Sequence, residues 1–600
     1  MCGIVGYVGT QLVAKQSILR GLHQLEYRGY DSAGVALHRD GHISVIKRAG
    51  KVNQVEEALA SIEEATLGIG HTRWATHGKP TETNAHPHQS EHGHFVIVHN
   101  GVIENAQALK TNYLKDVQFE STTDSEVIAQ LIEHFYQQGA EALDAFQQAV
   151  RLLEGSYAIV CMYKGDAQTL YVAKNKSPLL IAKSETSFML ASDIAAFTPQ
   201  CTMVMEFQDG EMAIVHPSSF VLLREDGTPV KREMDPLHFE QTDTSKGNFS
   251  HFMLKEMHEQ PDVLKNLVRT YTEASGALTV DAGVIDLMKQ ADWINIIGCG
   301  TSYHAGLVGK RLFERIGNVP THVFMASEFS YFTPILPKNS IAIVLSQSGE
   351  TADIRNVVAQ MKAKGVPVLA LTNNERSTIA READMHMHLL AGPEIAVAST
   401  KAYIAEIGVL AILAKAVGLE LNHSYPFDVP KQFAIASEAM RFVLNERLDM
   451  AKCKKPLAGH QDAIVMGRAM DYYTSLEAAL KIKEVSYMNC NAYPAGELKH
   501  GPIALIEEGT PVLALITNKR VAAAMRSNIE EVRARGAHVS IIAMAGLDQP
   551  GDDYVLPLVH PLLTPLVGII PFQYISYFEA LDRGLDVDQP RNLAKSVTVE

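Results

Sequence analysis

The pattern of hydrophobic positions changes at about residue 235 of the chain. Before that point, the apolar residues form short runs rich in β-branched and aromatic side chains. Examples are residues 43–48, 94–98, 157–163 and 211–215. Two segments with helical spacing, 11–24 and 125–153, interrupt these runs. Short runs of this composition are typical of strands, so the first part of the chain is predicted to be a sheet-rich, layered domain of strands and helices.

From about residue 283, strand-like runs alternate with longer helical segments. The runs are residues 293–298, 321–324, 340–345 and 366–371. This alternation is typical of βαβ units and predicts a parallel sheet. A polar stretch at 240–248 lies between the two patterns and is predicted to be a linker.

The second part of the chain also repeats itself. Residues 463–467 resemble the run that ends at Gly298, residues 495–498 resemble 326–329, and residues 511–516 resemble 341–346. The offset is about 170 residues each time, which predicts two copies of one doubly wound unit.

Composition narrows the class of protein. With 600 residues, the chain is too long for one core, and about two to four domains are expected. A net charge of −15 argues against general nucleic-acid binding. We find no long apolar run and no signal peptide pattern, so a cytoplasmic protein that does not enter the membrane is expected. The six cysteines are scattered, without a C-x-x-C pair, which fits a reducing compartment.

Cys2 is the first candidate for chemistry. If Met1 is removed, this residue carries a thiol and a free α-amino group, and the amine can act as the base for its own side chain. Residues 3–9 read as a short strand, which would hold the thiol at a rigid sheet end. Taken alone, a cysteine at this position is more often an ordinary small residue near the start of a chain.

Three polar clusters follow, at 70–78, 99–101 and 122–126. Arg73 offers a guanidinium fork for a carboxylate, and Asp124 offers a partner for an ammonium group, so together they fit a free amino acid. Asn100 and the N–H group of Gly101 fit an oxyanion hole. Each also has a structural explanation: a surface ion pair for Arg73, a tight turn for Asn100-Gly101, and a helix N-cap for Asp124.

Taken together, these clusters resemble the N-terminal-cysteine glutamine amidotransferases. The resemblance is carried by residues 2–6, 27–34, 73–78 and 99–101. It implies an N-terminal-nucleophile (Ntn) αββα sandwich in which Cys2 attacks glutamine and its own amine is the base. It further implies an oxyanion hole at Asn100 and Gly101. The implied glutamine-binding residues are Arg73, Thr76, His77 and Asp124.

A hydroxyl-rich loop, 346–351, lies between a predicted strand and a helix beginning near Ala352. Hydroxyl and N–H groups at a helix N-terminus bind anions. The loop lacks the lysine of a P-loop, so a monophosphate is expected rather than a nucleoside triphosphate. Residues 299–302 end another strand on the same expected sheet edge. A dinucleotide site is rejected there, because position 303 is tyrosine rather than glycine.

Three further segments carry charged side chains: the helical segment 481–484, the segment 497–502, and the tail 590–600, which mixes apolar and cationic residues. The first is commonly a solvated helix face. With the hydroxyl-rich loop, however, these segments closely resemble the family of isomerising glutamine–fructose-6-phosphate aminotransferases, over essentially the whole chain. The resemblance implies a homodimeric enzyme of amino-sugar biosynthesis. It would convert D-fructose 6-phosphate and L-glutamine to D-glucosamine 6-phosphate and L-glutamate, without a metal or other cofactor.

The same resemblance implies a multidomain α/β architecture, with the Ntn sandwich followed by two doubly wound sugar-isomerase (SIS) subdomains. The implied ranges are 1–240 for the amidotransferase, 241–282 for a linker with leading helices, 283–425 and 450–590 for the SIS subdomains, and 591–600 for a catalytic tail.

Roles for individual residues also follow from the resemblance. Glu484 would move a proton between C1 and C2, assisted by Lys481, and Lys595 would engage the C2 carbonyl. His500, supplied by the neighbouring subunit, would assist ring opening, and Trp74 would gate an internal ammonia passage. The implied sugar-phosphate-binding residues are Thr301, Ser302, Ser346, Gln347, Ser348, Thr351 and Val397.

Three alternatives remain. The dense histidines between His71 and His99 suggest a metal site, but no acidic or thiol ligand completes one, and surface histidines are expected. An amidotransferase that makes phosphoribosylamine would need an Asp-Asp signature after a strand, whereas Asp552-Asp553 follows Pro550-Gly551. An inactive sugar-phosphate sensor is disfavoured by the intact Cys2, Glu484, His500 and Lys595.

Overall fold

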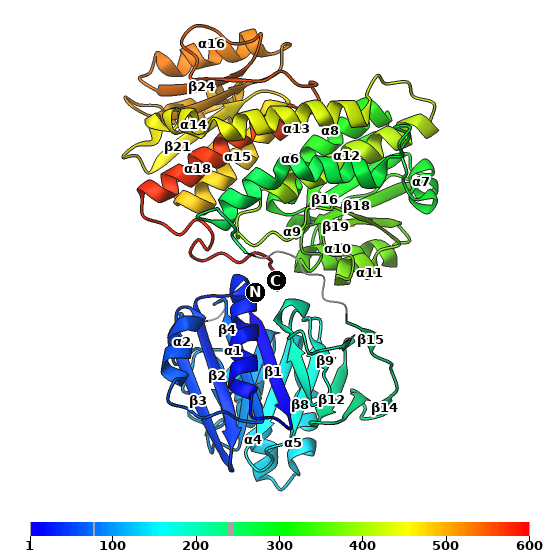
Figure 1. Cartoon of the computed structure of the whole chain (residues 1–600), viewed down its shortest axis with the longest axis vertical. Coiled ribbons are helices and arrows are strands. Elements are labelled where there is room, and N and C mark those ends of the chain that lie inside the picture. The colour runs from blue at the N-terminus through cyan, green and yellow to red at the C-terminus, as the bar shows by residue number, and fades with distance from the viewer. Residues whose placement is uncertain (1, 76–77, 238–244, 599–600) are drawn as a thin grey trace. The chain divides into compact units, whose positions relative to one another are not determined.

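The computed structural model describes residues 2–75, 78–237 and 245–598 (Figure 1). The chain divides into two compact units, Met1–Gln241 with Asn592–Val599, and Thr242–Arg591. We call them the N-terminal and the C-terminal unit. The end of the chain therefore groups with the N-terminal unit, although it follows the other unit in sequence.

The N-terminal unit contains two antiparallel sheets. The first has the order β15 (Asp235–Pro236), β11 (Met203–Glu206), β9 (Leu180–Lys183), β10 (Ser187–Ala191), β1 (Gly3–Gly9), β4 (Leu67–Arg73), β2 (Ser32–Arg39) and β3 (His42–Ala49). The second has the order β14 (Pro229–Val230), β13 (Phe220–Arg224), β12 (Glu211–Val215), β8 (Leu170–Asn175), β7 (Gly155–Tyr163), β6 (Phe95–Ile103) and β5 (His88–Gln89).

The alternating side chains of strand β1 show which layers cover the two faces of the first sheet. Successive side chains of a strand point to opposite faces. Ile4 and Val8 accordingly join the core between the two sheets, while Val5 and Tyr7 join the core under helix α1 (Ala14–Leu25). A third core lies between the second sheet and the helices α4 (Ser125–Gln137) and α5 (Ala142–Val150). The order helix, sheet, sheet, helix is the predicted αββα sandwich.

The remaining helices of this unit are short. They are α2 (Val52–Leu59), α3 (Ala106–Tyr113) and the 3-10 turns Glu26–Arg28 and Ile194–Ala196. The segment with helical spacing over 125–153 forms two helices, α4 and α5. Gly139 separates them with φ +96°, a conformation that glycine adopts readily.

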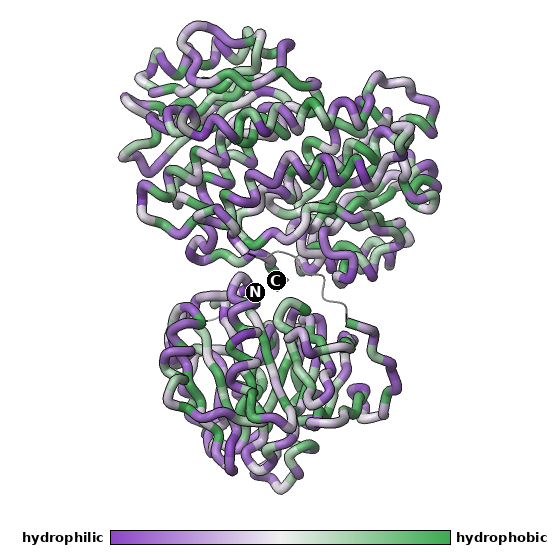
Figure 2. The backbone as a smooth tube through the Cα atoms, viewed as in Figure 1, coloured by the Kyte–Doolittle hydropathy of each residue, from purple (hydrophilic) through white to green (hydrophobic). Residues whose placement is uncertain are grey.

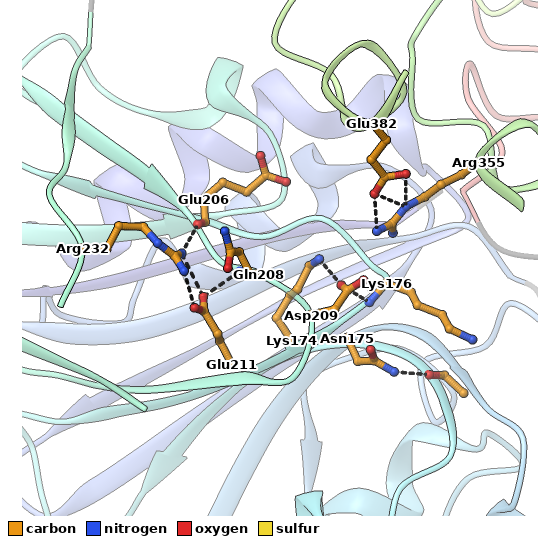
Figure 3. Close-up of polar contacts among 11 residues, drawn as sticks. Lys174, Asn175, Lys176, Glu206, Gln208, Asp209, Glu211, Arg232, Arg355 and Glu382 are labelled. Atoms are coloured by element: carbon orange, nitrogen blue, oxygen red, sulfur yellow. Dashed lines mark hydrogen bonds and ion pairs between the residues drawn. The ribbon is translucent and has the colours of Figure 1, made fainter. Parts of the chain in front are cut away.

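Two ion pairs, each with one buried partner, lie at the crossing from the first sheet to the second, between β11 and β12 (Figure 3). The guanidinium of Arg232 binds both carboxylate oxygens of Glu211, at 3.0 Å to Oε2. Asp209 pairs with the buried ammonium of Lys174 and accepts the backbone N–H of Lys176 at 2.6 Å. Side chains on both sides of the connection between β11 and β12 therefore hold this connection in place.

The C-terminal unit contains two parallel sheets of five strands each. The first has the order β17 (Thr321–Met325), β16 (Trp293–Gly298), β18 (Ser340–Ser346), β19 (Val368–Thr372) and β20 (Met385–His388). The second has the order β22 (Asn489–Pro494), β21 (Asp462–Gly467), β23 (Pro511–Ile516), β24 (His538–Met544) and β25 (Tyr554–Leu556). The order in sequence is the same in both sheets, which confirms the predicted repeat of a doubly wound unit.

Helices surround both sheets. They are α6 (Phe252–Tyr271), α7 (Ala282–Lys289), α8 (Gly300–Leu312), α9 (Ala326–Phe329), α10 (Ala352–Ala363), α11 (Thr378–Glu382), α12 (Lys401–Glu420), α13 (Val429–Asn445), α14 (Arg447–Cys453), α15 (Met470–Ser486), α16 (Ala522–Arg533), α17 (Thr564–Gly568) and α18 (Ile570–Asp582). Shorter turns are Phe313–Gly317, Lys455–Leu457, Glu497–His500 and Pro502–Leu505. An ion pair between Arg355 and Glu382, at 3.0 Å, joins α10 to α11 (Figure 3).

Helix α12 corrects one expectation from the sequence. Its 20 residues are long and apolar enough to cross a membrane by length and composition, although no such segment was expected. However, 89% of its most apolar window is buried inside the unit. Figure 2 shows green segments concentrated in the interior helices and strands of this unit. We therefore assign α12 as a core helix.

Candidate active sites

Cys2 lies immediately before β1 and beside the end of β4, because these strands pair with Gly3 opposite Thr72. Its sulfur accepts the backbone N–H of Trp74 at 3.4 Å and lies 3.5 Å from the Trp74 carbonyl oxygen. Its own carbonyl oxygen accepts a hydrogen bond from Asn100 Nδ2 at 3.0 Å. Burial raises the pKa of the Cys2 thiol, so a base is needed to generate the thiolate.

Asn100 and Gly101 lie within β6, which continues beyond them to Ile103. The alternative of a tight turn is therefore wrong. Gly101 has φ +136°, and a Cβ there would lie 1.9 Å from the carbonyl oxygen of Ser156 on the neighbouring strand. Glycine is required at this position, directly after Asn100, whose side chain contacts Cys2.

Arg73 is almost fully buried at the end of β4, so the surface ion pair is wrong. Its guanidinium donates to the carbonyl oxygens of Gly78 and Lys79 at 3.2 and 3.3 Å. Burial lowers its pKa, and interactions with Cys2, Asp31 and Asp124 oppose this effect. Arg73 thus lies close enough to Cys2 and Asp124 to interact electrostatically with both.

Asp124 directly precedes α4, but its side chain makes no capping hydrogen bond to that helix. Instead, Oδ2 accepts the backbone N–H of Ile103 at 2.8 Å, which ties the carboxylate to the end of β6. The N-cap explanation is therefore wrong. Thr76 and His77, also predicted to bind glutamine, lie outside the described residues.

The indole of Trp74 contacts the C-terminal tail. Its Nε1–H donates to the carbonyl oxygen of Asn592 at 3.4 Å, and the hydroxyl of Tyr30 donates to that of Leu593 at 2.8 Å. These contacts explain why the tail groups with the N-terminal unit. Lys595 lies half-buried within this tail, and its role in the sugar site stays a prediction.

The expectation of surface histidines is wrong for four of them: His71, His86, His88 and His99 are buried. Burial lowers the pKa of each, to about 3 for His71. Among residues 2–75, 78–237 and 245–598, no group of three or more histidine, cysteine or acidic side chains is arranged to hold a metal ion.

The hydroxyl-rich loop of the C-terminal unit runs from the end of β18 to the start of α10. Ser346 Oγ accepts the N–H of Gly349 at 3.0 Å and lies 2.9 Å from Thr351 Oγ1. Ser348 Oγ accepts the N–H of Glu350 at 3.2 Å. Gln347 completes the loop, and its carbonyl oxygen accepts the N–H of Asn373 at 3.1 Å. This compact loop presents hydroxyls at the N-terminus of a 12-residue helix, an arrangement suited to an anion.

Thr301 and Ser302 lie in the first turn of α8, directly after β16. Strands β16 and β18 are parallel neighbours, so this turn and the hydroxyl-rich loop share one sheet edge. Thr301 donates to Glu477 at 3.0 Å, and Ser302 donates to Glu406 at 2.6 Å. Val397 is nearly buried, and its N–H donates to Asp588 at 3.0 Å.

Lys481 and Glu484 form an ion pair of 2.6 Å on helix α15. Lys481 Nζ also lies 3.1 Å from Thr301 Oγ1 and 3.4 Å from Glu477 Oε1. Burial by itself lowers the pKa of Lys481, but the carboxylates of Glu484 and Glu477 outweigh it and hold the pKa above its ordinary value. Lys481 is therefore a fixed positive charge beside Glu484. His500 is exposed on the surface of the same unit.

Glu477 was not predicted from the sequence. Its side chain is 1% exposed, and besides Thr301 and Lys481 it binds His304 Nδ1 at 2.7 Å. The available signal was its position four residues before Lys481. If the helical segment 481–484 is extended by one turn towards the N-terminus, the two side chains lie on one face.

Comparisons with known proteins agree with an amidotransferase site in the N-terminal unit and a sugar-phosphate site in the C-terminal unit. A family model described as a glutamine amidotransferase domain matches residues 71–199, and one described as a SIS domain matches residues 287–416 and 457–549. The chain is 49% identical to the glutamine–fructose-6-phosphate aminotransferase (isomerizing) of Bacillus subtilis and 48% identical to that of Geobacillus kaustophilus, over 601 residues and the full length of each protein.

Among solved structures, the C-terminal domain of the glucosamine-fructose-6-phosphate aminotransferase of Francisella tularensis matches with a TM-score of 0.53 and 33% identity. The match covers 58% of this chain and all of that one. With full-length relatives close to half identical, the chain belongs to the isomerising glutamine–fructose-6-phosphate aminotransferase family.

Proposed function

We propose that this protein transfers the amide nitrogen of L-glutamine to D-fructose 6-phosphate, giving D-glucosamine 6-phosphate and L-glutamate. The observation that carries the proposal is the convergence on Cys2 of groups from two neighbouring segments, the end of β4 and strand β6. The Cys2 sulfur accepts the backbone N–H of Trp74, directly after β4, and the Cys2 carbonyl oxygen accepts a hydrogen bond from the Asn100 side chain of β6. The similarity to SIS domains and the hydroxyl-rich loop support the second half of the reaction, in which the sugar phosphate accepts the nitrogen.

In the glutaminase half, the Cys2 thiol gives its proton to the α-amino group that removal of Met1 would free. The sulfur attacks the glutamine amide carbon, and the carbonyl oxygen becomes an oxyanion facing Asn100 and Gly101. When this tetrahedral intermediate collapses, the C–N bond breaks and the nitrogen takes a proton from the α-amino group and leaves as ammonia. Water then hydrolyses the thioester to glutamate and frees the Cys2 thiol. The nearby charges of Arg73 and Asp124 support binding of the amino acid.

In the isomerase half, the hydroxyls of Ser346, Ser348 and Thr351 hold the sugar phosphate at the start of α10. Ammonia adds to the C2 carbonyl, which Lys595 engages, and water is lost. Glu484 then carries a proton from C1 to C2. The raised pKa of Lys481 supports a role as a permanent cation beside Glu484, rather than a role as a base.

The proposal includes three features of the assembled enzyme. Trp74 gates an internal passage for ammonia, which stays uncharged and nucleophilic away from water. The protein acts as a homodimer in which His500 serves the site of the neighbouring subunit, and the exposed position of His500 supports this role. We also propose a cytoplasmic location, where both substrates are available.

The decisive experiment supplies glutamine labelled with ¹⁵N in the amide together with fructose 6-phosphate. We expect labelled glucosamine 6-phosphate by mass spectrometry, and the Cys2→Ala variant should make none while still binding the sugar phosphate. Phosphoribosyl diphosphate serves as the competing acceptor. Transfer of label to that acceptor, or sugar binding without any transfer, would contradict the proposal.

A further inference from the structure

We propose that His71 is a positioning residue that fixes the Asn100 side-chain amide with its N–H groups toward Cys2. Because the role concerns the oxyanion of glutamine hydrolysis, this inference rests on the proposed glutaminase activity.

Hydrogen bonding determines which way the Asn100 amide faces. His71 Nε2 lies 3.1 Å from the carbonyl oxygen of His99 and 2.9 Å from Asn100 Oδ1. A backbone carbonyl can only accept, so Nε2 must carry the hydrogen. The Asn100 atom facing Nε2 must then be the acceptor oxygen. The amide nitrogen is consequently turned to the other side, where it donates to the Cys2 carbonyl at 3.0 Å.

The His71 ring is itself held in place. It is fully buried on β4 and stacks on His86, with ring centres 4.1 Å apart and an angle of 18° between the planes. His86 is fixed in turn, because its Nδ1 accepts the backbone N–H of His99 at 3.2 Å.

The protonation state of His71 agrees with this role. Among the described residues, no hydrogen-bond partner reaches His71 Nδ1, as expected for a neutral ring protonated at Nε2. Burial, with the charge of Arg73 adding to it, lowers its pKa to about 3, so the same tautomer persists at neutral pH.

The two orientations of an asparagine amide have nearly the same shape, so packing alone selects between them weakly. In the wrong orientation, a carbonyl oxygen would face the developing oxyanion and a donor would be lost. Loss of one oxyanion-hole donor typically lowers kcat about 100- to 1000-fold. His71 and the Cys2 carbonyl oxygen together distinguish the two orientations, because His71 offers a donor where only the amide oxygen fits and the carbonyl oxygen accepts only from the amide nitrogen.

The test compares His71→Phe with His71→Gln. Phenylalanine keeps a ring against His86 but has no donor, so kcat for glutamine hydrolysis should fall about 100-fold while KM for glutamine changes little. Glutamine carries an N–H donor and should recover most of the rate. His71→Leu is assayed beside His71→Phe so that the comparison does not depend on one variant folding. Exposed His92 gives the matched control, His92→Phe, which should behave as wild type.

A second readout separates positioning from damage to the fold. Alkylation of Cys2 by iodoacetamide forms a carbon–sulfur bond and expels iodide without forming an oxyanion. Its rate should therefore be unchanged in His71→Phe. In an Asn100→Ala background, the same substitution should have no further effect on kcat.

Normal hydrolysis by the donor-free variants would overturn the inference, as would a parallel fall in alkylation and hydrolysis. Failure of His71→Gln to recover activity would also contradict it. Absence of glutamine hydrolysis in the wild type would instead reject the proposed function, and the inference with it.

Discussion

Gly101 has no room for a side chain, and its φ of +136° is strained for any other residue. We expect Gly101→Ala to abolish glutamine hydrolysis and to destabilise the N-terminal unit by about 1–3 kcal/mol or more. The added methyl would collide with the Ser156 carbonyl 1.9 Å away and push apart β6 and β7. Glutaminase assays and thermal unfolding would measure both effects. Gly139→Ala is the matched control, since its φ is also positive but nothing lies within 4 Å.

The buried histidines predict sensitivity to acid. His71 has a pKa of about 3 in the folded protein against 6.5 ordinarily, so between these values the unfolded chain binds more protons. Stability is therefore unaffected by His71 above pH 6.5 and falls as the pH drops below it, by up to about 1.4 kcal/mol per pH unit for each such histidine.

Unfolding measured from pH 7.5 to 5.0 tests this prediction. The pKa of buried His88 is also lowered by burial, so His88→Gln should flatten the slope, whereas exposed His92→Gln should leave it unchanged. Equal slopes in all three proteins would show that the buried histidines do not cause the sensitivity.

At the level of elements, the loop before α10 depends on Ser346, whose hydroxyl accepts the Gly349 N–H and meets Thr351. Ser346→Ala removes one proposed ligand of the sugar phosphate and loosens the loop. A hydrogen bond is worth roughly 0.5–1.5 kcal/mol, and up to about 3 with a charged partner. We expect KM for fructose 6-phosphate to rise at least about tenfold, with unchanged glutamine hydrolysis. Steady-state kinetics of synthesis and of glutamine hydrolysis measure both effects. The control variant Ser327→Ala, at an exposed position, should change neither the KM for fructose 6-phosphate nor the rate of glutamine hydrolysis.

Helix α15 brings Glu477 and Lys481 together in the core. Glu477→Leu would remove one of the carboxylates that balance the buried ammonium, and breaking such a pair typically costs about 3–5 kcal/mol. We expect a lower melting temperature of the C-terminal unit and loss of glucosamine 6-phosphate formation. Lys483→Ala, at an exposed position of the same helix, should have neither effect. An unchanged melting temperature in Glu477→Leu would mean that Glu484 alone balances Lys481.

At the scale of the whole molecule, changing the C-terminal tail tests whether glutamine hydrolysis and sugar synthesis depend on different residues. It groups with the N-terminal unit through Tyr30 and Trp74, yet Lys595 is assigned to the sugar reaction. We expect Lys595→Ala to abolish synthesis while glutamine hydrolysis continues. Separate assays of glutamate and glucosamine 6-phosphate measure this, with exposed Lys519→Ala as the control. Full synthesis by Lys595→Ala would reject the assignment.

The sequence determined the fold class and most of the candidate site residues. Alternation with period 2, the βαβ rhythm and the repeat are local patterns, because they reflect which face of each element is buried. The position of Cys2 and the hydroxyl-rich loop before α10 are likewise visible in contiguous residues.

Tertiary structure alone decided the environment of those residues. Burial of the four histidines, the His71–Asn100 contact and the position of Glu477 depend on segments brought together by strand pairing and helix packing. The same holds for Asn100 and Gly101 within β6, and for the tail beside Trp74. Desolvation and hydrogen bonding act through space, so no local pattern of residues could reveal them.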